Sequence, residues 1–195
     1  MKRNTVIVTI ICALVIAILV GVYAFLAGRQ RDIQEEAMLT VVEQTLARDL
    51  SNDYPASPKE VVKYYNEILK CYYNEECTNE DIDALGVQAR GVFDEELNSA
   101  NELGTYLVKI RNEVESFKEN GNRLSYTNLP PSTDVDYFEA DGFSFAKLIA
   151  SYTIKEGNGY VSMRLTYLLR RDEEKHWKIY GWQPFYDPEE AVAAK

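Results

Sequence analysis

The chain has 195 residues, of which 46% are hydrophobic and 12% aromatic, and its formal net charge is −10. This length allows one ordinary domain of roughly 100–150 residues beside a membrane segment, and the apolar content excludes a disordered chain. Lys2 and Arg3 are the only charged side chains before Arg29, so taking their two positive charges from −10 leaves −12 on the rest. That acidic surplus argues against nucleic acid and anionic membrane surfaces as partners.

An apolar run near the N-terminus predicts a transmembrane helix. No charged residue interrupts Thr5 to Ala27, and a helix of this length crosses a hydrocarbon core of about 30 Å. The two basic residues before it favour a cytoplasmic N-terminus and an extracytoplasmic domain. A signal peptide cleaved near Val22-Tyr23-Ala24 is the alternative, although the run exceeds the usual ~7–15 apolar residues. We therefore predict a single-pass cell-membrane protein anchored by residues 1–28.

Small residues recur along this predicted helix. Ala13, Ala17 and Gly21 are four residues apart and share one face, a spacing that lets two transmembrane helices approach closely. The chain itself is therefore one candidate partner, as a homodimer. A monomeric anchor whose small residues face lipid is the alternative.

The next segments are predicted to be helical. Residues 29–54 are expected to form a stalk, with a helix from about Gln30 to Leu50. The domain proper is expected over 55–186, followed by a tail over 187–195. Its helices are predicted from capping signals and from apolar residues three and four apart. They are a helix opened by Ser57-Pro58-Lys59-Glu60 and running to about Tyr73, a second opened by Thr78-Asn79-Glu80-Asp81, and a third from about Glu102 to Glu119.

Two cysteines of the predicted domain are six residues apart. Cys71 and Cys77 can form a disulfide only if the helix that contains Cys71 ends before Cys77, and Asn74-Glu75-Glu76 offers such a break. Two free, partly buried thiols are the alternative. No metal site is expected, because no histidine or third cysteine is near.

Beyond Gly121 the apolar period changes from 3.6 to 2, which predicts strands joined by short polar turns. The expected strands are Leu124–Thr127, Val135–Glu139, Phe143–Ile154, Tyr160–Leu169 and Trp177–Trp182. Helices followed by an antiparallel sheet make an α+β fold, in which the helices cover one face of the sheet.

Two parts of this pattern carry a family resemblance. Ser57-Pro58-Lys59-Glu60-Val61-Val62-Lys63-Tyr64-Tyr65 resembles the first helix of the nuclear-transport-factor-2-like (SnoaL-like) superfamily, and the segment from Tyr167 to Trp182 resembles its final hairpin. The resemblance implies a cone, in which a curved antiparallel sheet encloses a pocket that the helices close. The chain is also similar to bacterial membrane-anchored families that have one transmembrane helix before such a cone.

The predicted inner faces of the strands are apolar. On the fourth strand the inward residues are Val161, Met163, Leu165, Tyr167 and Leu169. On the last strand Trp177, Ile179 and Gly181 are expected to alternate with outward-facing His176, Lys178, Tyr180 and Trp182. No pair of titratable groups suited to general acid–base catalysis falls on these faces.

The remaining polar candidates are predicted to be surface residues. His176, the one histidine, falls at a turn beside Glu174 and Lys175 and is expected to be solvated. Asp94-Glu95-Glu96 and Glu80-Asp81 with Asp83 are expected on solvated helix faces, since neither group matches a calcium loop. We expect no metal, no cofactor and no catalytic residue.

Tyrosines form a band that has two interpretations. Tyr65 and Tyr72 on the first helix of the domain, with Tyr152 and Tyr167 on the strands, either pack in the core or line the mouth of a pocket. The sequence favours a non-catalytic binding or scaffold module of the bacterial envelope, whose partners are other envelope proteins or a second copy. The alternative is an isomerase-like or hydratase-like enzyme that uses Tyr65, Tyr72 or Tyr152.

Overall fold

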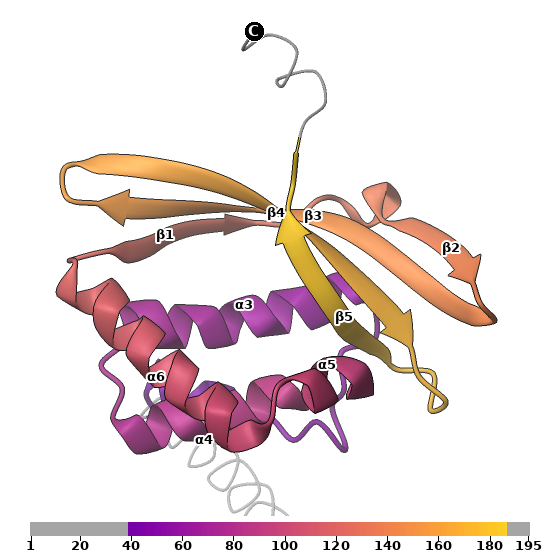
Figure 1. Ribbon diagram of the computed structural model, residues 1–195, viewed down its shortest axis with the longest axis horizontal. Coiled ribbons are helices and arrows are strands. Elements are labelled where there is room, and N and C mark those ends of the chain that lie inside the picture. Colours follow the sequence, from indigo (N-terminus) through magenta and orange to yellow (C-terminus); the bar gives the residue numbers. More distant parts are fainter. Residues whose placement is uncertain (1–38, 187–195) are drawn as a thin grey trace, which may run out of the picture. The chain divides into compact units, whose positions relative to one another are not determined.

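A computed structural model of the chain describes residues 39–186. The predicted anchor, with Ala13, Ala17 and Gly21, lies outside the described residues. Within residues 39–186 no helix is both long enough and apolar enough to span a membrane. Residues 41–186 form one compact unit, and its helices precede its strands (Figure 1).

In the part of the predicted stalk helix that the structure describes, residues 39–50, only Val41–Leu46 is helical and forms α2. It ends early because the Asp49 carboxylate accepts hydrogen bonds from the backbone and hydroxyl of Ser51 and from the Asn52 amide. Such local bonds offer the backbone an alternative to the helix. Val42 is buried, and Leu46 and Leu50 pack against the core. This segment is therefore part of the compact unit.

Capping explains where the next two helices begin. The Ser57 hydroxyl accepts a hydrogen bond from the Glu60 amide, and Pro58 occupies the first helical position. Thr78 and Asp81 form a complete capping box, in which each side chain bonds the backbone of the other. The predicted starts of both helices are confirmed. The helices are α3 (Pro58–Asn74) and α4 (Asn79–Arg90).

The last two helices differ from the prediction. α5 (Glu95–Ala100), which was not predicted, begins at Asp94 as its N-cap. α6 (Leu103–Glu119) has its predicted bounds, but only Val114 is fully buried and Leu103 is exposed. α6 approaches α4 closely at Gly86, where an added Cβ would lie 2.6 Å from Cδ2 of Leu107. As an outer helix it covers less of the core than its apolar spacing predicted.

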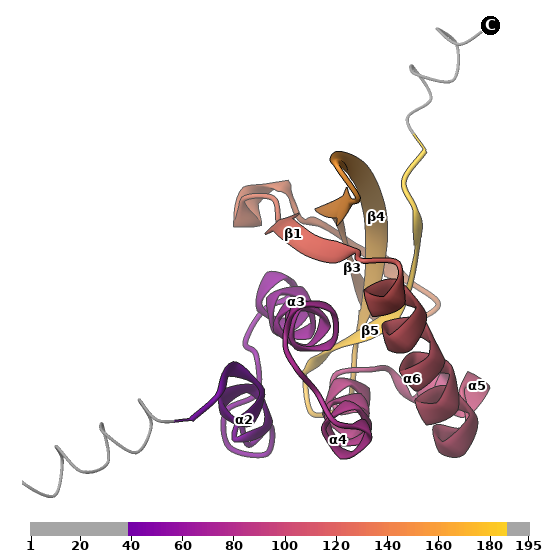
Figure 2. The same cartoon turned by 90° about the vertical axis from the view of Figure 1, so that its left-hand side faces the viewer.

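The sheet has five antiparallel strands, as predicted. Their order is β1-β3-β4-β5, and β2 pairs with the first half of β3, so that β1 and β2 share one edge of β3. The sheet is curved, and the helices lie against one of its faces (Figure 2). The strands are β1 (Arg123–Asn128), β2 (Asp136–Ala140), β3 (Phe143–Glu156), β4 (Gly159–Arg171) and β5 (Trp177–Pro184).

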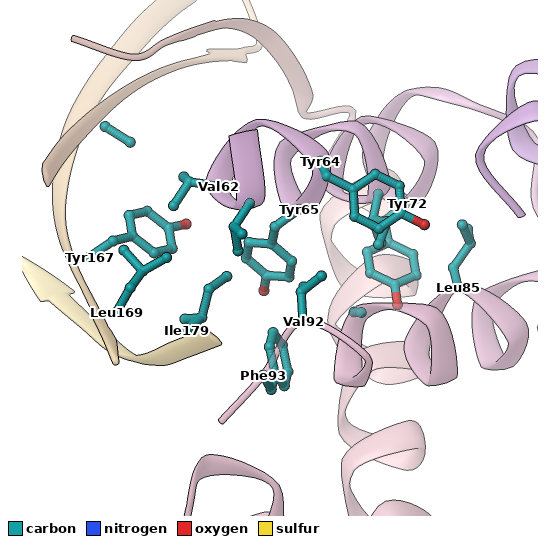
Figure 3. Packing of buried hydrophobic residues seen from close by; sticks show 14 of the residues in the cluster. Val62, Tyr64, Tyr65, Tyr72, Leu85, Val92, Phe93, Tyr167, Leu169 and Ile179 are labelled. Carbon is teal, nitrogen blue, oxygen red and sulfur yellow. The ribbon is translucent and has the colours of Figure 1, made fainter. Parts of the chain in front are cut away.

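The core lies between α3 and the covered face of the sheet. Tyr167 and Leu169 of β4 point toward Val62 and Tyr65 of α3 (Figure 3), and all four side chains are buried. On the other side of α3, Tyr72 lies close to Leu85 of α4. The inward direction predicted for the second half of β4 is therefore confirmed.

A bulge corrects the predicted alternation of β5. The register shifts between Leu168 and Leu169, so Leu169 pairs with Ile179 but Tyr167 pairs with Trp182. One extra residue reverses which side chains face the core. Trp182, predicted to face outward, therefore lies on the core side, with its ring centroid 5.6 Å from that of Tyr65.

Candidate functional site

The four tyrosines proposed from the sequence lie in the core: Tyr65, Tyr72, Tyr152 and Tyr167. The Tyr152 hydroxyl donates to Oδ1 of Asn66 over 2.8 Å and lies 2.7 Å from the Tyr167 hydroxyl. The structure brings Tyr65 into edge contact with Tyr167, whereas Tyr72 faces α4. None of the four lines either of the two cavities described below, and all four are buried in the core.

Burial raises the pKa values of these phenols. Desolvation raises the pKa of Tyr152 to about 12, although its hydrogen bonds to Tyr167 and Asn66 act in the opposite direction. Desolvation also raises the pKa of Tyr65 and Tyr167 well above the ordinary value. These hydroxyls are therefore protonated at neutral pH, which suits packing and hydrogen bonding better than proton abstraction.

Cys71 and Cys77 are free thiols in the structure, one of the two states that their spacing left open. The Cys77 thiol donates to the carbonyl oxygen of Cys71 over 3.3 Å, near the end of α3. Burial raises the pKa of both thiols, to about 11 for Cys77. At neutral pH they are protonated and therefore weak nucleophiles.

His176 lies at the predicted turn and is half-buried. Its ring stacks on Tyr54 with the centroids 4.2 Å apart, and its amide donates to Asp172 over 2.7 Å. These contacts fix the turn between β4 and β5.

An open cleft of about 1330 Å³ lies beside the end of the sheet. Its walls come from the segment after α4, from α5 and the start of α6, from the β2–β3 turn, and from the end of β4 with the β4–β5 turn. A second cavity of about 340 Å³ lies between α2 and α3. The larger cleft is the candidate site, because polar side chains from distant parts of the chain converge in it.

The centre of this cleft is an ion pair. Arg170 of β4 donates from Nε and Nη2 to the two carboxylate oxygens of Asp94, over 2.9 and 2.6 Å. Its Nη1 donates to Glu96 over 2.7 Å, and Tyr180 donates to the other oxygen of Glu96. Asp94 is only 3% exposed. The sequence prediction that this acidic segment is solvated is therefore wrong for Asp94.

Backbone pairing holds Asp94 at this place. The amide of Ile179 in β5 donates to the carbonyl of Val92, and the amide of Asp94 donates to the carbonyl of Ile179. The Asp94 carboxylate also accepts a bond from the Glu96 amide, which caps α5. α5 thus begins beside β5 at the edge of the sheet, and the side chain of Arg170 reaches Asp94 there.

Three charged side chains of the cleft have pKa values shifted by their neighbours: Arg170, Glu96 and Glu102. Burial lowers the pKa of Arg170, but its bonds to Asp94 and Glu96 outweigh burial, and the net shift is upward. Hydrogen bonds from Tyr180 and Arg170 lower the pKa of Glu96, and backbone bonds from Gly104 and Thr105 lower that of Glu102. All of these groups are ionised at neutral pH.

Negative charge is in excess. The lining contains seven carboxylates and four cations: Asp94, Glu95, Glu96, Glu102, Asp172, Glu173 and Glu174, against Arg90, Arg170, Arg171 and Lys178. Each cation donates to an acceptor of the chain; Arg90, for example, bonds the carbonyls of Asn98 and Asn101. The side chains of Glu95, Glu173 and Glu174 form no hydrogen bond or ion pair with any residue of the described range. The surplus charge therefore faces solvent.

Sequence reasoning missed this site because its two halves are 76 residues apart. Asp94 was expected on a solvated helix face, and Arg170 was not among the inward residues predicted for its strand. The one local signal is Asp94 itself, because aspartate is a favoured N-cap residue and the Glu96 amide lies two residues later. Nothing local indicates that Asp94 pairs with a strand.

A family model described as "Domain of unknown function (DUF6715)" matches residues 1–182. No curated protein matches the chain.

Proposed function

The chain belongs to the family described as domain of unknown function (DUF6715), and from that premise we propose that it is a membrane-anchored, extracytoplasmic binding module without catalytic activity. The matched range includes the apolar N-terminal run as well as the domain. The proposed partner is another protein of the bacterial envelope, and the proposed contact surface is the acidic cleft.

The cleft carries this proposal. Its volume suits part of a protein partner better than a buried small molecule, because it is wide and open to solvent. The Asp94–Arg170 pair fixes its shape by joining α5 to β4. Its ionised carboxylates present a constant negative field, which steers and orients a partner without proton transfer.

Two apolar side chains add contact area to this charged surface. Leu103 and Phe143 are 41% and 47% exposed, and both line the cleft. Exposed apolar groups inside a charged rim are typical of protein contact sites. A partner whose positive side chains meet the free carboxylates is the one that this surface suits best.

The proposed fold family is the nuclear-transport-factor-2-like cone. Helices that precede a curved antiparallel sheet and cover one of its faces support this assignment (Figures 1 and 2). The proposed anchor rests on the uncharged run from Thr5 to Ala27. Together they give a domain tethered at its N-terminal side.

Membrane topology is tested in intact cells that make the full-length chain. Protease added outside spheroplasts should degrade the domain, and alkaline extraction should leave the chain in the membrane pellet. A protected domain would overturn the extracytoplasmic placement, and release of the chain by alkali would overturn the anchor.

The contact surface is tested by photocrosslinking in the same cells. A photoreactive residue at Ser99, which lines the cleft, should give a discrete adduct with another envelope protein. The matched control is the same residue at Val87, which is 53% exposed on α4 and does not line the cleft. Replacing Glu95, Glu173 and Glu174 by Gln should remove the Ser99 adduct, and identical adducts from both sites would contradict the proposal.

A further inference from the structure

Among residues 39–186, no strand pairs with the edge of β4 near the β3–β4 hairpin. β5 reaches only as far as Pro184 opposite Leu165, with one further bond from the Phe185 amide to the Arg164 carbonyl. Figure 1 shows β5 ending near the middle of β4. Within residues 39–186, nothing pairs with residues 159–163 on the side away from β3.

The direction of each backbone group on this edge follows from the bonds that β4 makes. The Arg164 carbonyl points to the β5 side, and backbone groups alternate along an antiparallel strand. The amides and carbonyls of Ser162 and Tyr160 therefore point to the same open side, while those of Val161 and Met163 point to β3. Two residues thus offer free donors and acceptors for another strand.

The side chains of this edge lack the usual protection against pairing. Tyr160, Val161 and Met163 are 68%, 47% and 40% exposed, and residues 159–163 contain no charge. By contrast, the outer edge strand β2 carries Asp136 and Glu139. Charged residues on an edge strand commonly prevent unwanted pairing with other strands. Residues 159–163 lack such charges, which favours a functional pairing with another strand at this edge.

We propose that this edge binds the same edge of a second copy of the chain, antiparallel and across a two-fold axis at Val161. In this register Tyr160 and Ser162 of one copy exchange backbone hydrogen bonds with Ser162 and Tyr160 of the other. Val161 meets Val161 of the second copy, so apolar groups meet on the axis. The pairing brings together a neutral segment of a chain whose net charge is −10, which avoids repulsion between acidic surfaces.

The chain's own tail is the competing occupant. Continuing the β4–β5 register would bring Pro188 opposite Val161, with Asp187 and Glu189 beside it. Proline, aspartate and glutamate are depleted in strands, whereas the valine, tyrosine and methionine of a second β4 edge suit one better. The second copy is therefore the better match for this edge.

Disulfide trapping in the full-length chain tests the register. The Cα atoms of a non-hydrogen-bonded antiparallel pair lie about 4.5 Å apart, within the range of a disulfide. Val161→Cys should therefore give at least about tenfold more covalent dimer under mild oxidation than Tyr160→Cys, because residue 160 of one copy lies opposite residue 162 of the other and only diagonally from residue 160. The native chain, treated in parallel, gives the baseline from the existing cysteines.

Adding Ser162→Pro to Val161→Cys gives a blocking variant that spares the fold. The Ser162 amide points to the open side, so proline there removes no bond to β3 but prevents pairing with a second strand. Dimer yield should fall to the Tyr160→Cys level, with the unfolding midpoint of the monomer unchanged. Equal trapping at 160 and 161, or no trapping in a folded Val161→Cys chain, would overturn the proposal. An intramolecular disulfide in Val161→Cys/Pro188→Cys would instead assign the edge to the tail.

Discussion

The two halves of β4 carry the same alternation of apolar side chains but have different surroundings. In the second half, Tyr167 and Leu169 are buried under α3 and paired with β5. In the first half, Val161 and Met163 lie on the same face yet are 47% and 40% exposed, and β5 does not reach them. Alternation therefore identifies the side chains that share a face, but it does not say whether another element covers that face.

The largest expected difference between the halves is in packing energy. Leu169→Ala should lower the free energy of unfolding by about 4 kcal/mol, because it leaves a cavity beneath α3. Urea unfolding of the full chain in mild detergent, followed by the fluorescence of Trp177 and Trp182, measures this loss. If Leu169→Ala lowers the free energy of unfolding no more than Val161→Ala does, the covered half of β4 contributes no more to stability than the open half.

A second difference concerns the arginine at the covered end. Asp94→Asn should cost about 2–3 kcal/mol, because the mostly buried Arg170 loses its bidentate carboxylate partner and keeps only the exposed Glu96 among the described residues. The matched control is Asp136→Asn, which breaks the exposed Lys147–Asp136 pair and should cost far less. Similar unfolding midpoints for the two variants would show that the Asp94–Arg170 pair does not join α5 to the sheet.

A third prediction uses pH and the buried hydroxyl of Tyr152. At neutral pH, Tyr152→Phe should cost about 1–2 kcal/mol, because Oδ1 of Asn66 loses its donor. The pKa of Tyr152 is raised to about 12 in the folded chain from an ordinary value of 10. Tyr152 therefore loses its proton at a lower pH in the unfolded wild-type chain than in the folded one. The free energy of unfolding of the wild-type chain falls as pH rises from 10 toward 12.

The Phe variant lacks that titration, so the difference between the two chains should shrink over the same interval. Urea titrations at a series of pH values measure it. A difference that stays constant with pH would show that Tyr152 is not desolvated in the folded chain.

The smallest effect is expected in the open half of β4. Val161→Thr keeps the β-branched shape and should change monomer stability by no more than about 0.5 kcal/mol. Dilute protein is required, so that pairing between copies does not contribute. A larger loss would mean that this half of the strand is covered after all.

The success of the sequence predictions depends on the distance over which each signal acts. Capping at Ser57 and Thr78 and the turn at Gly121 act within a few residues. The starts of α3 and α4 and both ends of α6 fall close to their predicted positions. The strands were predicted for the same reason, since an alternation of period 2 is a local property. Three features were not predicted: the core-side position of Trp182, the short helix α5 and the Asp94–Arg170 pair.

Each of these three features depends on contacts between distant residues. Trp182 changes faces because of a bulge that depends on how β5 pairs with β4. Asp94 is buried because its backbone pairs with Ile179, 85 positions later in the numbering. The sequence by itself determined α3, α4, α6, the strands and the α+β class, because hydrogen bonds within a turn and side-chain periodicity fix them. Only the tertiary structure decided which faces are covered and which charges meet, because burial and ion pairing depend on elements that the chain brings together by folding.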